Sequence, residues 1–367
     1  MLEGENLVKI EQMAPWFGRE EADAVAEYMR SGAWITEYAR TREFEDALAN
    51  FAKSQRCVVV SNGTVSLFVA LLGLGVKPGD EVIVPDLTQI ASANSAILAG
   101  ARPVLADISP DDLSLDLADV KRKLTDKTKA IVLVSLNGRC PRIREYVEFA
   151  RSNSLRLVED AAQSLGSQVD GKQLGTFGDV GSFSFSTPKI ISTGQGGALV
   201  TDDLKLDENF RRIKDFGRIA SGVDKHVTLG YNFKFTDLQA VVGIEQMKKL
   251  PWRVERKKKM FDLYRESLSR VEQVKFIDTD TKQTPPWAID IICEKRESLI
   301  SFLSRNGIGS RTFHPPIHTQ MPYALEPQGS FPVSEEVSRK GLWLPSSSFL
   351  TDEQILEICK EVKKFYQ

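Results

Sequence analysis

The feature that most constrains the fold is an alternation of short apolar runs with helix-like segments between residues 56 and 202. The runs are rich in β-branched residues, and amphipathic stretches separate several of them. The expected strands are residues 57–60, 81–84, 103–106, 130–134, 155–158, 180–185 and 197–201. Strands that alternate with helices usually pair in parallel and are covered by helices on both faces. We therefore predict an α/β domain with a mostly parallel sheet between helices.

A second domain is expected because a chain of 367 residues is too long for one ordinary hydrophobic core. The alternation has ended by Pro251, which follows a long helical pattern and is expected to terminate it. Residues 351–367 have the pattern of a final helix with Thr351 as its N-cap. We predict a large domain at residues 1–250 and a smaller C-terminal α+β domain at residues 251–367.

Composition and charge exclude several classes of function. The 48 basic and 50 acidic residues give a net charge of −2, so nucleic acid is not an expected partner. The densest basic run, residues 253–259, is expected to form a solvated helix face. The four cysteines and three histidines lack the spacing of a zinc site or disulfide framework, so we expect no metal and a reducing, cytoplasmic compartment.

One uncharged stretch, residues 58–76, approaches the length of a membrane span. It is interrupted by Ser61-Asn62-Gly63-Thr64, which is more typical of a buried strand, loop and helix than of a bilayer segment. No membrane partner is therefore expected.

The same four residues are a candidate anion site. Ligands of parallel sheets bind at the carboxyl ends of the strands, and this segment ends an apolar run just before a helical pattern. Free N–H groups at a helix N-terminus, beside the small Gly63 and the hydroxyl of Thr64, form a cup for phosphate. Taken alone, the segment is also compatible with a simple polar turn.

A second strand end carries acidic residues. The run at 155–158 leads into Glu159-Asp160, with Gln163 close behind. A carboxylate at the end of a buried strand is costly unless it meets a cation or a hydrogen-bond donor. A protonated pyridine nitrogen is one such partner, and a structural arginine or a helix N-cap is the alternative.

Lys189 follows the apolar run at 180–185 and precedes a glycine-rich turn, with hydroxyl residues on both sides. Most lysines are solvated surface charges. A lysine held away from water has a lowered pKa, however, and can form a Schiff base with an aldehyde. Asn232, in the segment before the next helical pattern, is either a turn cap or a ligand contact.

The order of these segments resembles that of fold-type I enzymes dependent on pyridoxal 5'-phosphate (PLP), in which a lysine and an acidic partner hold the cofactor. From about Trp34 onward the chain is similar to the sugar-nucleotide aminotransferases of the DegT family. The matching stretches include SNGTVSLFVALLGLGVKPGDEVIVP, TQIASANSAILAGARPVLADI, LVEDAAQSLGS, GDVGSFSFSTPKIISTGQGGALVTDD, LGYNFKFTDLQAVVGIEQM and GLWLPSSSFLTDEQI.

The resemblance implies roles for individual residues. Lys189 matches the Schiff-base lysine, and Asp160 matches the acid on the pyridine nitrogen. Gln163 matches a side chain near the ring oxygen. The other implied cofactor contacts are Gly63, Thr64 and Ser184 at the phosphate, Gln89 at the ring, and Asn232 at the phosphate of the neighbouring subunit's cofactor. His318 matches a segment near the substrate entrance.

Three segments depart from the family pattern. Gln89 stands where an aromatic residue usually stacks on the cofactor ring. Ser135-Leu136-Asn137-Gly138 replaces a His-Leu-Tyr-Gly sequence, and residues 35–40 replace a Gly-Pro turn. These departures concern the ring contact and the identity of the substrate.

The function implied by the resemblance is amination of a keto-deoxy sugar nucleotide, with glutamate as the expected donor and an active site shared across a homodimer. A PLP-dependent sugar-nucleotide dehydratase is the alternative within enzymes, but such dehydratases carry histidine in place of the lysine. A non-catalytic regulatory protein of the same fold is a further alternative, which loss of Lys189 or Asp160 would have favoured. Both residues are present.

Overall fold

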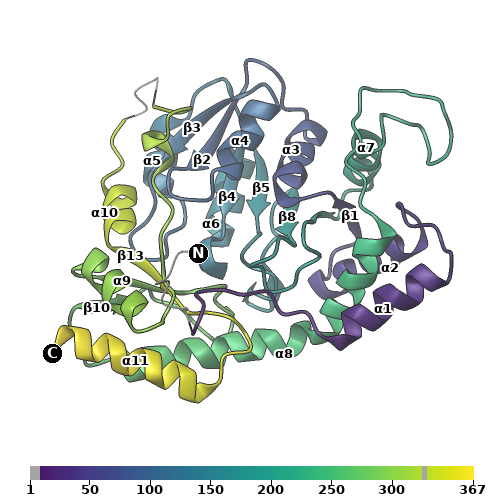
Figure 1. Cartoon of the computed structure of the whole chain (residues 1–367). Helices are drawn as coiled ribbons and strands as arrows, with labels where there is room; N and C mark the ends of the chain where they lie inside the picture. The colour runs from purple at the N-terminus through teal and green to yellow at the C-terminus, as the bar shows by residue number, and fades with distance from the viewer. Residues whose placement is uncertain (1–8, 325–328) are drawn as a thin grey trace.

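The computed structural model describes residues 9–324 and 329–367. Its centre is a seven-stranded sheet with the order β1-β9-β8-β5-β4-β2-β3 (Figure 1). The strands are β1 (Arg56–Val60), β2 (Glu81–Pro85), β3 (Arg102–Ala106), β4 (Thr128–Val134), β5 (Arg156–Asp160), β8 (Val180–Ser184) and β9 (Gly197–Thr201). β9 is antiparallel to both of its neighbours, and the other pairs are parallel. The predicted strands are all present, which confirms the mostly parallel α/β architecture.

Helices cover both faces of this sheet (Figure 1). In β2, Val82 and Val84 pack in one cluster with α3 and α4, whereas Ile83 packs in another with α5 and α6. Successive residues of a strand point to opposite faces, so a strand covered on both sides must be apolar throughout. The helices of this part are α1 (Arg19–Arg30), α2 (Ala39–Ala52), α3 (Gly63–Gly73), α4 (Ala91–Leu98), α5 (Leu117–Lys123), α6 (Ile143–Ser152) and α7 (Leu204–Lys214).

The uncharged stretch at residues 58–76 folds as the predicted strand, loop and helix. It forms most of β1, a short loop and α3, and the Asn62 side chain caps the helix by accepting a hydrogen bond from Val65 N at 3.0 Å. Among the described residues, no helix is both long and apolar enough to cross a bilayer.

The C-terminal part contains a second sheet of four antiparallel strands in the order β10-β11-β13-β12. Thr351 caps the last helix in a capping box with Gln354, as predicted. The elements are β10 (Val274–Phe276), β11 (Ile289–Cys293), α9 (Arg296–Arg305), β12 (Arg311–Thr312), η2 (Ile317–Thr319), α10 (Pro332–Lys340), β13 (Gly341–Leu344) and α11 (Asp352–Tyr366). Three short elements lie elsewhere: η1 (Leu136–Gly138), β6 (Gln168–Val169) and β7 (Lys172–Gln173).

The long helix α8 (Asp237–Leu268) corrects one expectation, because it continues through Pro251 instead of ending there. A proline inside a helix removes one backbone hydrogen bond, but burial of an amphipathic face can outweigh that loss. Residues on both sides of the proline are buried, including Leu250 and Met260. The proposed domain boundary at residue 250 therefore falls inside a continuous helix and stays a prediction.

The basic run in α8 is a second correction. Arg253 and Lys257 are only 3% and 2% exposed, so the prediction of a solvated face is wrong for both. Residues four apart share one helix face, and here that face is the buried one. Arg253 donates to Ile190 O at 2.8 Å, and Lys257 Nζ donates to the carbonyl oxygens of Trp287, at 2.7 Å, and Ser346.

Candidate active site

The carboxyl ends of β5 and β8 lie side by side in the middle of the large sheet. Asp160, the last residue of β5, is in register with Ser182 of β8. Helix α3 begins next to them, since a Cβ atom on Gly63 would come within 2.8 Å of Ser184 Cβ. Only glycine permits this approach, because 2.8 Å is shorter than any favourable carbon–carbon contact. The fold thus brings together three of the predicted site residues.

The N-terminus of α3 has unpaired donors that suit an anion. The side chain and carbonyl of Asn62 accept hydrogen bonds from Val65 N and Ser66 N, each at 3.0 Å. Within the described residues, the N–H groups of Gly63 and Thr64 have no hydrogen-bond partner. Two free N–H groups at a helix N-terminus form a site for an anion such as phosphate.

Asp160 is buried in a polar pocket at 6% exposure. Its Oδ2 accepts a hydrogen bond from Ser92 Oγ at 2.7 Å, and its Oδ1 accepts one from Ala162 N at 3.2 Å. Burial raises the pKa of the Asp160 carboxyl, while these hydrogen bonds and the charge of Lys189 act in the opposite direction. A carboxylate in such a place can hold a cationic ring nitrogen.

Lys189 is placed by a turn after β8, in which its backbone N donates to Ser186 O at 2.9 Å. Burial lowers the pKa of its amine to about 8, although the Asp160 carboxylate favours the charged form. The Nζ atom lies 4.8 Å from the ring centroid of Trp287. The indole Nε1 of Trp287 donates to Pro188 O at 2.7 Å, which fixes the ring against the lysine turn.

Gln163 connects the site to the segment that departs from the family pattern. Its Oε1 accepts a hydrogen bond from Asn137 N at 2.7 Å. The Asn137 side chain then pairs with the backbone of Ala288, donating to its O at 2.7 Å and accepting from its N at 2.5 Å. Asn137 adopts a left-handed conformation with φ of 55°, which asparagine tolerates better than most residues. The departure therefore joins the two sheets.

Two further predicted residues have contacts of their own. Gln89 is exposed, and its Oε1 accepts a hydrogen bond from Ala91 N at 2.5 Å at the start of α4. His318 is held by the buried Asp86, whose carboxylate contacts His318 N and Nδ1 at 2.8 Å each. Its ring stacks on Phe331 with a centroid distance of 4.7 Å.

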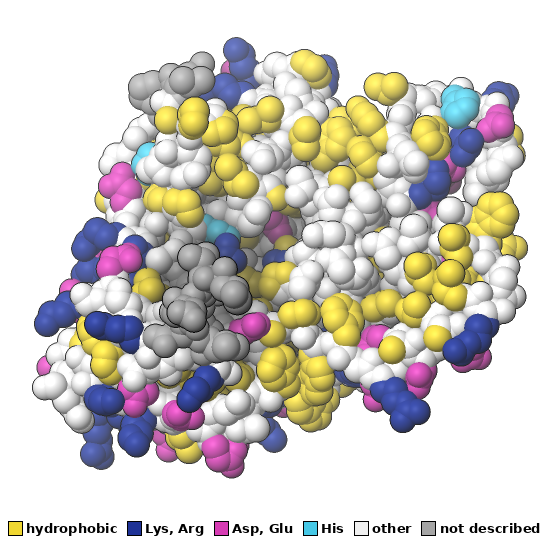
Figure 2. Space-filling model, in the orientation of Figure 1, with side chains coloured by type: hydrophobic (Ala, Val, Ile, Leu, Met, Phe, Trp, Pro, Cys, Tyr) yellow, Lys and Arg dark blue, Asp and Glu magenta, His cyan; other side chains and the backbone are white. Residues whose placement is uncertain are grey.

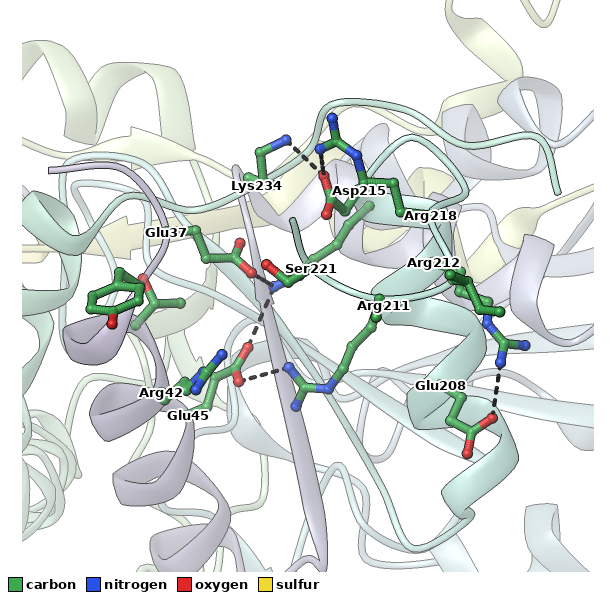
Figure 3. A pocket seen from close by; sticks show the side chains of 15 residues that line it. Glu37, Arg42, Glu45, Glu208, Arg211, Arg212, Asp215, Arg218, Ser221 and Lys234 are labelled. Carbon is green, nitrogen blue, oxygen red and sulfur yellow. Dashed lines mark hydrogen bonds and ion pairs between the residues drawn. The ribbon is translucent and has the colours of Figure 1, made fainter. Parts of the chain in front are cut away.

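Asn232 is exposed and lies in the segment that follows α7, where it forms an isolated bridge with Asp215. Asp215 also lines a hollow of about 600 Å³ between α2 and α7, shown in Figure 3. Ion pairs cross this hollow: Lys214 Nζ lies 2.9 Å from Glu37, and Arg211 lies 2.9 Å from Glu45. None of the predicted cofactor contacts lines it, so the hollow is distinct from the Lys189 site.

Sequence reasoning missed three residues of the site: Ser92, Asn137 in its bridging role, and Trp287. Ser92 lies in the stretch TQIASANSAILAGARPVLADI, which resembles the family, but nothing local connects it to Asp160. Trp287 follows a proline pair far along the chain, and no local pattern connects it to Lys189.

The face drawn in Figure 2 is hollowed near its centre, where cationic, acidic and imidazole side chains are visible.

Comparisons with known proteins agree over nearly the whole chain. The model of the DegT/DnrJ/EryC1/StrS aminotransferase family matches residues 16–363. The GDP-perosamine synthase of Escherichia coli O157:H7 is 36% identical over 351 residues, covering 95% of this chain and 96% of that protein. The dTDP-4-dehydro-2,3,6-trideoxy-D-glucose 4-aminotransferase of Saccharopolyspora spinosa is 31% identical over 368 residues, covering 95% of each chain.

The solved structure of the aminotransferase TlmJ from Streptoalloteichus hindustanus gives a TM-score of 0.92 at 30% identity, covering 97% of this chain and 98% of that one. The match therefore includes both sheets and the long helix between them. Sequence and structure lead to the same assignment: the chain belongs to the DegT/DnrJ/EryC1/StrS aminotransferase family of fold-type I PLP enzymes.

Proposed function

We propose that this chain uses PLP on Lys189 to transfer an amino group from glutamate to a keto-deoxy sugar nucleotide. The observation that carries the proposal is the position of two buried ionisable groups after adjacent strands: Asp160 at the end of β5 and Lys189 in the turn after β8, where burial lowers the lysine pKa to about 8. A dehydratase of this family would lack the lysine. A purely regulatory protein would have no use for a buried carboxylate and a partly neutral amine at one site.

The residues present fit the cofactor. Asp160 can accept a hydrogen bond from the pyridine nitrogen, and the free N–H groups of Gly63 and Thr64 can hold the phosphate, with the Ser184 hydroxyl beside them. When bound, PLP supplies an electron sink that stabilises negative charge on the carbon next to the transferred nitrogen.

Lys189 then has two tasks that its pKa allows. A fraction of its amine is neutral near pH 7 to 8, so Nζ would hold the cofactor covalently through its aldehyde. When Nζ is free, it would accept the proton from the donor's α-carbon and return it as a general acid. The Trp287 ring, 4.8 Å away, limits where the free amine can move.

We propose a GDP-linked sugar as the first substrate to test, because the GDP-perosamine synthase is more similar to this chain than the dTDP-sugar aminotransferase is, at 36% against 31% identity. Purified protein would be incubated with glutamate and a panel of GDP-, dTDP- and UDP-linked keto sugars. Formation of 2-oxoglutarate together with an aminated GDP-sugar, identified by mass, is the expected result. Amination of a dTDP- or UDP-sugar alone would contradict the choice of nucleotide, and no amination would contradict the function.

We also propose a homodimer in which Asn232 reaches the partner's cofactor. Large apolar side chains are exposed on the segment that precedes α2 and on the segment that follows α7, and Leu229 is 78% exposed. The others are Trp34, Ile35, Tyr38, Phe216, Ile219, Val223 and Val227. Exposed apolar groups gathered in one region are typical of an interface, and in Figure 1 the segment after α7 projects from the molecule. A second copy of the chain would cover this surface.

A further inference from the structure

The turn that carries Lys189 is attached to the buried face of the long helix α8. Arg253 Nη1 donates to Ile190 O at 2.8 Å, and Gln246 Oε1 accepts a hydrogen bond from Ser192 N at 3.2 Å. Residues seven apart on a helix share one face, and Gln246 and Arg253 are only 1% and 3% exposed. Two side chains of α8 therefore hold the backbone that directly follows Lys189.

The same two side chains hold the segment that precedes α1. Arg253 Nη2 donates to Trp16 O at 2.9 Å, and Gln246 Nε2 donates to the same oxygen at 3.0 Å. The Arg253 guanidinium lies 5.2 Å from the ring centroid of Trp16, and its Nη1 also donates to Gln246 Oε1 at 2.6 Å. Arg253 and Gln246 thus connect two segments that are distant in the sequence.

Arg253 is a buried cation without a carboxylate partner. Within the described residues it forms no ion pair, and its Nε atom has no hydrogen-bond partner. Glu21 pairs instead with Lys249, at 2.6 Å. A cation in such surroundings costs free energy, and an apolar side chain of similar volume would fill the space without that cost. What the arginine adds is a planar fork of N–H donors with a fixed geometry.

We infer that Arg253, together with Gln246, is a positioning residue that fixes the Lys189 turn and thereby the place of the lysine amine. The inference rests on the proposed function, because it concerns the lysine that would hold the cofactor. On the other side of the lysine, Pro188 O accepts a hydrogen bond from Trp287 Nε1 at 2.7 Å. The backbone is therefore held both before and after Lys189, and the amine moves mainly through rotations of its own side chain.

A lysine with this role needs a fixed backbone. A misplacement of about 1 Å can slow a reaction by about 100-fold, even when the substituted residue lies far from the chemistry. The turn ends in Gly194, Gly196 and Gly197, and glycine adds little restraint of its own. Restraint has to come from contacts outside the turn, and the hydrogen bonds from Arg253 and Gln246 supply it.

The first test examines the amine of Lys189 without cofactor or turnover. Full-length protein free of cofactor would be labelled with acetic anhydride at a series of pH values, and peptide mass would give the labelling rate at Lys189. The wild type should reach half of its maximal rate near pH 8. In R253M and Q246M the loosened turn admits water, so this midpoint should rise by about one pH unit, toward the ordinary lysine value. R253K, which keeps one cationic donor, should recover part of the shift.

K249M is the matched control on the same helix. It removes the ion pair between α8 and Glu21 of α1, and among the described residues Lys249 has no hydrogen bond to the lysine turn. The free energy of unfolding, measured with denaturant, should fall in K249M because Glu21 loses its cation. The labelling midpoint of Lys189 should stay near pH 8.

The loaded enzyme gives a second readout. R253M should lower the single-turnover rate with glutamate by about 10- to 100-fold. The KM values for glutamate and for the sugar nucleotide should stay within about twofold of wild type, because neither substrate contacts Arg253 in this inference. K249M should keep the wild-type rate within about twofold.

Two outcomes would overturn the inference while leaving the proposed function intact. If R253M and Q246M unfold more easily but keep the wild-type midpoint and rate, the two side chains serve only to anchor the segment before α1. If K249M shifts the midpoint and slows turnover as much as R253M does, the cause is a general loosening of α8. If R253M does not fold, R253K and Q246M decide between these outcomes. If the wild type transfers no amino group, the proposed function fails instead, and labelling of the cofactor-free protein still tests the place of Lys189.

Discussion

Lys189 shows how surroundings give one residue its chemistry. An ordinary lysine, with a pKa of about 10.4, is almost fully protonated at neutral pH. Burial beside β8 and Trp287 lowers the pKa of this amine to about 8, in spite of the Asp160 carboxylate. The same amine can therefore act as nucleophile, base and acid within a narrow pH range.

The rate at which PLP becomes attached to cofactor-free protein should follow the ionisation of Lys189. Because the neutral amine attacks, the rate should rise with pH and reach half of its maximum near pH 8. Stopped-flow absorbance would give the rates, and borohydride reduction followed by peptide mass would locate the linkage. Lys189→Ala should show no linkage, and a midpoint above pH 10 would contradict the lowered pKa.

Asp160→Asn should retain the cofactor but slow proton transfer. A neutral amide cannot favour a protonated ring nitrogen as a carboxylate does, so the single-turnover rate with glutamate should fall by about 100-fold or more. Ser92→Ala should slow the single-turnover rate less, because it removes only one hydrogen bond to the carboxylate. A normal rate in Asp160→Asn would move the pyridine partner elsewhere.

At the scale of secondary structure elements, α8 holds two segments of the small sheet through a buried side chain. Lys257 is 2% exposed and donates to the carbonyl oxygens of Trp287, just before β11, and Ser346, just after β13. Burial lowers the pKa of its amine to about 7. The anchor of the tryptophan that covers Lys189 is thus a lysine that loses its charge near neutral pH.

Lys257→Met should destabilise the protein by about 1–3 kcal/mol, since two buried carbonyls lose their donor. The native pKa near 7 lies below the unfolded value near 10.4, so the unfolded state binds more protons between these limits. Wild-type stability should therefore rise with pH from 7 to 9 relative to the variant. Denaturant unfolding at several pH values would measure the stability of both proteins. A difference in stability that does not change with pH would contradict the lowered pKa of Lys257.

At the scale of the whole molecule, a buried ion pair joins the two sheets. Arg139, directly after η1, makes a two-point contact with Asp290 of β11, and both side chains are at most 2% exposed. Arg139 also lies 3.3 Å from Thr279 Oγ1. Together with the pairing of Asn137 and Ala288, this contact fixes the small sheet against the segment that follows β4.

Arg139→Met and Asp290→Leu should each cost about 3–5 kcal/mol, because each leaves a buried charge without its partner. The double variant should be more stable than either single variant, since no charge remains. Denaturant unfolding of all four proteins completes the cycle. Additive losses would mean that the two side chains contribute independently.

The proposed sharing of the active site across a dimer can be tested by subunit exchange. Lys189→Ala and Asn232→Ala protomers should each be inactive, and a mixed dimer should regain one intact site. Activity is compared before and after exchange, with subunit mixing verified by mass. If exchange occurs and activity does not rise, Asn232 acts within its own subunit or as a turn residue.

The sequence by itself determined the elements of the large sheet and the order of its motifs. Apolar runs with turn signals define strands locally, and the rule for parallel sheets places Gly63, Asp160 and Lys189 at one edge. These inferences need only neighbours along the chain. The same local reasoning identified the capped final helix.

Tertiary structure decided which side chains meet across long separations. The burial of Lys257, the passage of α8 through Pro251 and the position of Trp287 over Lys189 depend on packing between segments about 30 to 100 residues apart. A local sequence pattern carries no information about such contacts, because a basic run has the same sequence whether its helix face is solvated or buried. Gln89 is a further example. Its position in the sequence predicted a contact with the cofactor ring, and in the structure its side chain accepts a hydrogen bond from Ala91 N at the start of α4.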